Sequence, residues 1–184
     1  IKSQIASVVP HLPNYYQFQT LGEYNALLSL FNITTEKVQG EFQEKMQQGL
    51  LYIPLNEKGE RAGHPFKSSL FGKHAGLAAL ELHFAKSKAA MKEHPTRETL
   101  KAAVTIALQS TTDELSFKKL LVQQGINVVV RRNDAGRICE MIFIDHNSMT
   151  VWHGSHLDKE LSANTFNDHW SNNIKPEINE PNDP

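Results

Sequence analysis

The sequence predicts an α+β fold in which four or five helices pack on antiparallel strands. Amphipathic stretches with apolar residues three or four positions apart predict the helices, and β-branched runs bounded by Asn and Gly predict the strands. In addition, a helix-plus-hairpin pattern occurs twice. Asn56 and Gly59 lie three residues apart in the first copy, and Asn133 and Gly136 repeat this spacing in the second.

The repeated pattern has two explanations. A Phe follows each of these Asn residues ten positions later, at Phe66 and Phe143. Either one helix-plus-hairpin unit is used twice, or two unrelated elements share the Asn and Gly that tight turns require in any case. The expected organisation is an N-terminal extension at 1–19, a first helix-hairpin-helix unit at 20–110, a second such unit at 111–171 and a disordered tail at 172–184.

The first half begins with a short helix and an extended stretch in residues 1–19. Thr20 and Glu23 have the spacing of a capping box, which predicts a helix that runs to about Phe31 and stops at Asn32. Pro54 cannot donate to a sheet, so its strand ends there or lies at an edge. The remaining elements are a strand at 36–43, a strand at 50–55, a turn at 56–61, a returning segment at 61–67 and a long helix at 72–92.

The second half continues with two helices, at 97–109 and 113–124, the latter ended by Gly125. The β-branched run at 126–130 is typical of a buried strand. The turn at 133–136 leads to a strand at 137–145, a tight turn at 146–148, a strand at 149–153 and a helix at 161–170. The segment from Asn172 onward has little apolar content, which favours a disordered tail or a linker.

Composition excludes several classes of protein. Forty per cent of the residues are apolar, enough to bury an interior, and the single Cys139 excludes an internal disulfide framework and favours a reducing, cytoplasmic compartment. No apolar run approaches the ~20 residues of a membrane helix. Nineteen basic and 20 acidic residues give a net charge of −1, so only a local basic face could support nucleic-acid binding.

One segment carries a family resemblance. It contains Arg137-Ile138, then Ile144-Asp145-His146-Asn147, then Gly154-Ser155, Leu157 and Lys159, and finally Ser162-Ala163-Asn164. In these residues the chain resembles the relaxase/mobilisation nucleases of bacterial mobile elements. The resemblance extends more loosely over most of residues 20–170, and Asp158 departs from it because the family favours Gly there.

The resemblance implies a role beside a nuclease. The family nicks one DNA strand at a transfer origin with a metal-bound His cluster and a nucleophilic Tyr, both in its N-terminal portion. The present sequence shows no such His-x-His pair with a preceding catalytic Tyr, and it resembles the region that follows the nuclease domain. We therefore expect a non-catalytic accessory region without a cofactor of its own, a divalent metal only in an upstream nuclease domain, and no membrane. The expected partners are origin DNA, single-stranded or duplex, and other mobilisation proteins.

The candidate DNA contacts lie at the hairpin tips and in the turns before helices. Lys and Arg side chains there could neutralise phosphates, and a Ser turn before a helix could hold a phosphate oxygen. Solvated hairpin tips and ordinary Ser capping explain the same residues without DNA. The candidates are Arg131, Arg132, Arg137, Ser155 and Lys159 in the second copy, with Lys67, Ser69 and Lys73 in the first.

Two other functions remain open. A protein-interaction or structural module without DNA contact agrees with the near-neutral charge. A metal-dependent hydrolase would use His146, His153 and His156, because His153-x-x-His156 has a spacing that can chelate a metal. Exposed turn histidines explain the same pattern without a metal, so no metal ligand is assigned.

Overall fold

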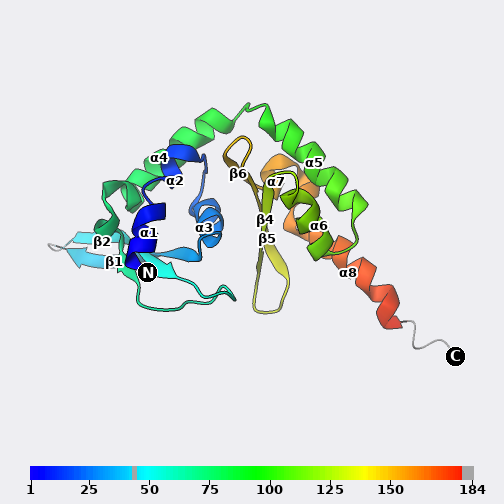
Figure 1. The fold of residues 1–184 in the computed structure, drawn as a ribbon, viewed down its shortest axis with the longest axis horizontal. Coiled ribbons are helices and arrows are strands. Elements are labelled where there is room, and N and C mark those ends of the chain that lie inside the picture. Colours follow the sequence, from blue (N-terminus) through cyan, green and yellow to red (C-terminus); the bar gives the residue numbers. More distant parts are fainter. Residues whose placement is uncertain (43–44, 180–184) are drawn as a thin grey trace. The chain divides into compact units, whose positions relative to one another are not determined.

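The computed structural model describes residues 1–42 and 45–179 and shows an α+β chain (Figure 1). The described strands are antiparallel, as the sequence predicts, and they form two three-stranded sheets. Five helices within these residues have nine residues or more. The chain divides into two compact units, Ile1–Lys92 and Glu93–Pro184, each with one of the sheets.

The boundary between the units falls at Lys92 and Glu93, whereas the sequence placed it between residues 110 and 111. Helix α5 (Thr96–Ser110) packs on α6 (Glu114–Val122) and on α7 (Gly154–Leu157), and all three belong to the second unit. The packing of α5 therefore places it in the second unit. The position of Pro95 in the sequence does not reveal this packing.

The first unit contains three short helices, a sheet and a long helix. Its strand order is β1-β2-β3, with β3 paired only to Leu51 and Tyr52 of β2. Two 3₁₀ turns, Ser68–Phe71 and Lys73–Ala75, separate the sheet from the long helix. The elements are α1 (Lys2–Val8), α2 (Leu12–Tyr15), α3 (Leu21–Ser29), β1 (Ile33–Phe42), β2 (Lys45–Pro54), β3 (Phe66–Lys67) and α4 (Leu77–Met91).

The predicted cap of α3 is present. The Thr20 hydroxyl accepts a hydrogen bond from the Glu23 backbone N–H at 3.1 Å. The Glu23 carboxylate in return accepts from the N–H of Gln19 at 2.8 Å, one residue before the cap. Asn32 adopts φ 61°, a left-handed conformation that stops the helical path before β1.

The interior of the first unit is built around two tyrosines. Tyr24 on α3 and Tyr52 on β2 are both fully buried, and their hydroxyl oxygens lie 2.9 Å apart. Tyr52 also donates to the carbonyl of Ala75 at 2.7 Å. Phe18 stacks on Tyr24 with ring centroids 4.9 Å apart. Burial raises the pKa of both tyrosine hydroxyls above the ordinary value of 10.0.

The second unit packs helices on a sheet of order β4-β5-β6. Phe143 on the central strand lies in an aromatic cluster with Phe117 of α6 and with Phe166 and Trp170 of α8, with ring centroids 5.3–6.3 Å apart. The elements not yet named are β4 (Ile126–Arg132), β5 (Ile138–Asp145), β6 (Thr150–His153), a 3₁₀ turn at Lys159–Leu161 and α8 (Ala163–Asn179).

Helix α8 continues to Asn179, so its residues 172–179 are helical where the sequence predicts a disordered tail. Residues 180–184 of that tail lie outside the described part of the chain. The low apolar content of the segment does not prevent the backbone from continuing the helix.

The two Asn–Gly turns have the same local geometry. The side-chain oxygen of Asn56 accepts from the N–H groups two and four residues later, at 2.9 Å, and that of Asn133 does the same at 3.0 Å. Gly59 and Gly136 adopt φ 79° and 83°. However, within the first unit two strands precede its turn, whereas within the second unit only β4 does. The repeat is therefore shown for the turn, while the order of the elements around it differs.

Candidate nucleic-acid interface

A depression of about 400 Å³ lies in the second unit between the turn after β4, helix α7 and the start of α8. The residues that line it include Arg137, Ser155, Ser162 and Asn164. Arg137 and Ser155 are two of the eight predicted DNA contacts. The structure therefore brings together two predicted residues that lie far apart in sequence.

The position of Arg137 is fixed by the Asn133 turn. The Asn133 side chain accepts from the Arg137 N–H, and the Asn133 N–H donates to the Arg137 carbonyl at 2.9 Å. The Arg137 guanidinium donates to the side-chain oxygen of Asn164 at 3.0 Å. This partner is a neutral amide, and no ion pair of Arg137 occurs among the described residues.

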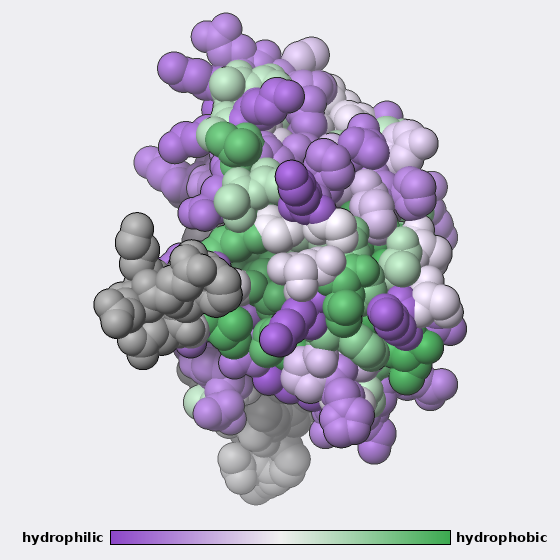
Figure 2. Space-filling view, turned by 90° about the vertical axis from the view of Figure 1, so that its left-hand side faces the viewer, coloured by the Kyte–Doolittle hydropathy of each residue, from purple (hydrophilic) through white to green (hydrophobic). Residues whose placement is uncertain are grey.

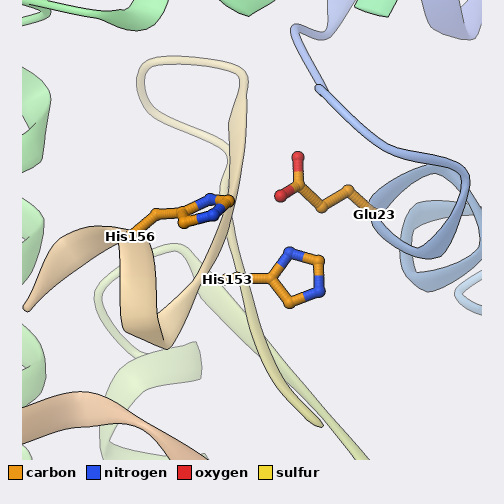
Figure 3. A group of neighbouring side chains, drawn as sticks. All are labelled: Glu23, His153 and His156. Atoms are coloured by element: carbon orange, nitrogen blue, oxygen red, sulfur yellow. The ribbon is translucent and has the colours of Figure 1, made fainter. Parts of the chain in front are cut away.

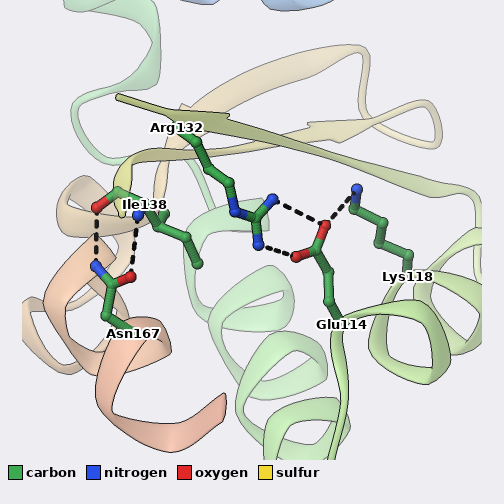
Figure 4. Close-up of polar contacts among 5 residues, drawn as sticks. All are labelled: Glu114, Lys118, Arg132, Ile138 and Asn167. Atoms are coloured by element: carbon green, nitrogen blue, oxygen red, sulfur yellow. Dashed lines mark hydrogen bonds and ion pairs between the residues drawn. The ribbon is translucent and has the colours of Figure 1, made fainter. Parts of the chain in front are cut away.

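Helix α8 is joined to the start of β5 next to this turn. Asn167 accepts from the backbone N–H of Ile138 at 2.9 Å and donates to the carbonyl of the same residue at 2.8 Å (Figure 4). One side chain thus binds both backbone groups of Ile138, whose own side chain is buried. These two hydrogen bonds fix the distance between Arg137 and the first turn of α8.

The other two predicted arginines face carboxylates. Nε of Arg131 lies 3.4 Å from a carboxylate oxygen of Glu140, its partner on the neighbouring strand. The two form an ion pair, but this contact does not have hydrogen-bond geometry. Arg132 binds both carboxylate oxygens of Glu114 on α6, and Lys118 approaches the same carboxylate at 2.9 Å (Figure 4). Neither arginine lines the depression.

The Glu114 cluster perturbs ionisation. Burial raises the pKa of Glu114, but the hydrogen bonds from Arg132 and Lys118 outweigh it and hold the pKa below its usual value. The hydrogen bond with Glu114 in turn raises the pKa of Arg132. The cluster therefore remains ionised at neutral pH and links α6 to β4.

Ser155 and Lys159 are separated by the structure. Both are exposed, but only Ser155 on α7 lines the depression, while Lys159 opens the following 3₁₀ turn. Asp158, the departure from the family pattern, caps this turn by accepting from the Glu160 N–H at 2.9 Å. It also pairs with Lys101 of α5 at 2.8 Å, and these two contacts lower its pKa. Asp158 thus has a structural role.

In the first unit, Lys67, Ser69 and Lys73 are all exposed. The prediction that the long helix starts at Gly72 is wrong, because Gly72 adopts φ 96° and α4 begins only at Leu77. Ser69 and Lys73 therefore lie in 3₁₀ turns and do not flank a helix N-terminus. Within the described residues no ion pair engages Lys67 or Lys73.

The three histidines of the predicted hydrolase do not converge. His146 binds the side-chain oxygen of Asn127 at 2.5 Å, and its burial lowers its pKa. His146 follows Asp145, the last residue of β5, whereas His153 on β6 pairs with Ile142, three residues earlier on β5. The two histidines are therefore about 10 Å apart along the strand direction. His153 and His156 do lie side by side, with ring centroids 5.5 Å apart.

Exposed apolar side chains are distributed over both units. Figure 2 shows one face of the molecule where hydrophobic groups are bordered by hydrophilic ones. None of the helices in the described part of the chain combines the length and the hydrophobicity that crossing a bilayer requires.

Sequence reasoning missed the acidic partners Glu114 and Glu140 and the amide partner Asn164. Asn164 belongs to the Ser162-Ala163-Asn164 run that carries the resemblance, so a signal for it was present. Glu114 lies 18 residues from Arg132, and no local pattern connects them.

Comparisons with known proteins add no relative. No protein-family model matches the chain, and no curated protein or solved structure matches it.

Proposed function

We propose that the chain is a non-catalytic region that holds DNA by its phosphate backbone, as an accessory part of a mobilisation relaxase at the transfer origin. One observation carries the proposal: Arg137 and Ser155 share a depression, and the Arg137 guanidinium is bound to an amide oxygen rather than to a carboxylate. The residues that carry the family resemblance supply the biological setting.

The chemistry of the depression suits a phosphate oxygen. A guanidinium has five N–H donors, of which one is given to Asn164. The remaining donors and the hydroxyl of Ser155 offer charge-assisted and neutral hydrogen bonds to the same anion. Phosphate groups of the DNA backbone require no base-specific contacts, so this site predicts binding without strong sequence preference.

The remaining predicted contacts differ in the strength they offer. A phosphate would have to compete with Glu140 and Glu114 for Arg131 and Arg132. Lys67 and Lys73 are exposed and add cationic charge in the first unit. With a net charge of −1, the whole chain attracts a polyanion only locally, so we expect weak and salt-sensitive binding.

The test is fluorescence anisotropy with labelled single-stranded and duplex oligonucleotides at about 50 and 200 mM salt, a range over which phosphate contacts weaken. The wild-type chain should bind at the lower salt, and Arg137→Gln should weaken binding about tenfold, the effect of one lost charged hydrogen bond. Arg97→Gln, which removes the same charge from α5 outside the depression, is the matched control and should bind like the wild type.

Two results would overturn the proposal. One is the absence of DNA binding at the lower salt, which would favour the protein-interaction alternative. The other is equal binding by the wild type and by Arg137→Gln.

A further inference from the structure

His153 and His156 form a histidine pair that the proposed DNA contact does not use. We propose that this pair binds a transition-metal ion of the Zn²⁺, Ni²⁺ or Cu²⁺ type, with Glu140 orienting His153. The inference is independent of the proposed DNA-binding function and differs from the hydrolase considered from sequence, because His146 takes no part.

The two rings come from the junction of a strand and a short helix. His153 ends β6, the chain turns at Gly154, and His156 follows on the first turn of α7. The ring centroids lie 5.5 Å apart with an interplanar angle of 59°, and one nitrogen of each ring lies within 4.8 Å of the other (Figure 3). Two imidazole nitrogens on one tetrahedral ion lie about 3.3 Å apart, so small side-chain rotations complete the chelate.

The backbone that carries the pair has little freedom. Gly154 is buried, and a Cβ added there would lie 2.0 Å from the carbonyl oxygen of Leu161. The neighbouring Trp152 and Leu157 are also buried. The two histidines are therefore held on a rigid junction, which reduces the entropy lost when a metal fixes their rings.

Glu140 supplies the outer contact that metal-bound histidines commonly have. It lies on β5, and its carboxylate is 3.9 Å from Nε2 of His153 on the neighbouring strand. This separation is an ion-pair contact and exceeds hydrogen-bond distance. A shift of the carboxylate that lets it accept from Nε2 would fix the neutral tautomer whose Nδ1 carries the lone pair. His153 would thus bind the metal through Nδ1, while its side chain is only 20% exposed.

The donor set selects the class of ion. Imidazole nitrogens suit Zn²⁺, Ni²⁺ and Cu²⁺, whereas Mg²⁺ and Ca²⁺ require oxygen ligands. Two protein nitrogens leave coordination positions for water or a further ligand. We therefore expect binding weaker than at a structural zinc site with four protein ligands.

The experiment is isothermal titration of the full chain, freed of metal with a chelator, with Zn²⁺ and separately with Ni²⁺. The wild type should bind one ion, and His153→Gln and His156→Gln should each reduce affinity at least tenfold. Glu140→Gln should reduce it about tenfold, as is typical when an outer carboxylate is removed. His74→Gln, an exposed histidine in the first unit, is the matched control and should leave the titration unchanged.

A second readout separates metal binding from folding. His156 is exposed, so His156→Gln should retain the circular dichroism spectrum of the wild type. The inference is overturned if the wild type binds no ion, or if folded His156→Gln binds as tightly as the wild type.

Discussion

The buried hydroxyls of Tyr24 and Tyr52 predict a loss of stability at high pH. Burial raises both pKa values in the folded state, while an unfolded chain has the ordinary value near 10.0. The folded state therefore holds these protons more tightly. Their contribution is fully present below pH 10 and is lost as the pH rises above it. Absorbance at 295 nm should show Tyr24 and Tyr52 ionising only as the protein unfolds. Ionisation of all four tyrosines before unfolding would contradict this.

The Thr20 cap gives a second prediction for a single residue. Thr20→Ala removes the acceptor for the Glu23 N–H and should lower the free energy of unfolding by about 1 kcal/mol. Thr20→Ser keeps the hydroxyl and should stay close to the wild type. Urea denaturation measures both variants, and equal losses would show that the methyl group, not the cap, contributes the stability.

Residue-level features were predictable where they depend on neighbours in sequence. The cap at Thr20, the stop at Asn32 and the glycine at Gly125, with φ 79°, follow from local backbone requirements. The partners of Arg131 and Arg132 depend on strand register and on a bulge between these two residues. That information is absent from a single sequence.

At the scale of elements, the junction of α7 with the following 3₁₀ turn makes the sharpest prediction. Gly154→Ala places a methyl group against the Leu161 carbonyl and within 3.2 Å of the Phe143 ring. Because the nearest atom is backbone, the element must shift, and we expect a loss of about 3 kcal/mol. Gly40→Ala, where the added atom meets nothing within 4 Å, is the control. A thermal or urea transition like that of the wild type for Gly154→Ala would contradict the packing.

The link between α6 and β4 is testable by a double-mutant cycle. Glu114→Gln, Arg132→Gln and the double variant should give a coupling of about 0.5–1 kcal/mol at neutral pH, because the pair is partly exposed to solvent. The pKa of Glu114 is lowered in the folded state. The coupling is therefore present above the ordinary pKa of Glu and is lost as the pH falls through the lowered value. A coupling that does not change on acidification would contradict this assignment.

Element prediction was most accurate in the second unit. In the β-branched run, Ile126 and Val128 are buried while Val129 and Val130 are half-buried. The apolar segment before Asp145 is buried, so hydrophobicity locates both β4 and β5. The first unit was harder because β1 carries mostly polar residues and is defined by its pairing with β2. The start of α4 was also missed, since Gly72 interrupts the helical path.

At the scale of the whole molecule, the division at Lys92 predicts two folding units. Each unit has its own sheet, and no described strand pairs across the boundary. Residues 1–92 and 93–184, expressed separately, should each show secondary structure by circular dichroism and a cooperative unfolding transition. A fragment that lacks such a transition would contradict the division.

The candidate site was only partly predictable, because its residues belong to three segments. The hairpin tip at Arg137 and the turn at Ser155 were recognisable from charge and turn chemistry. Arg137 and Ser155 come together because Asn167 of α8 binds the backbone of Ile138 through two hydrogen bonds. Only the tertiary structure reveals this contact.

The central claim is that a phosphate binds beside Arg137 and Ser155. Its most direct test is a titration of the ¹⁵N-labelled chain with a short single-stranded oligonucleotide at low salt, followed by amide chemical shifts. We expect the largest changes at Arg137, Ser155 and Asn164, reversed by added salt. Unchanged shifts at these three amides, with or without changes elsewhere, would contradict the claim.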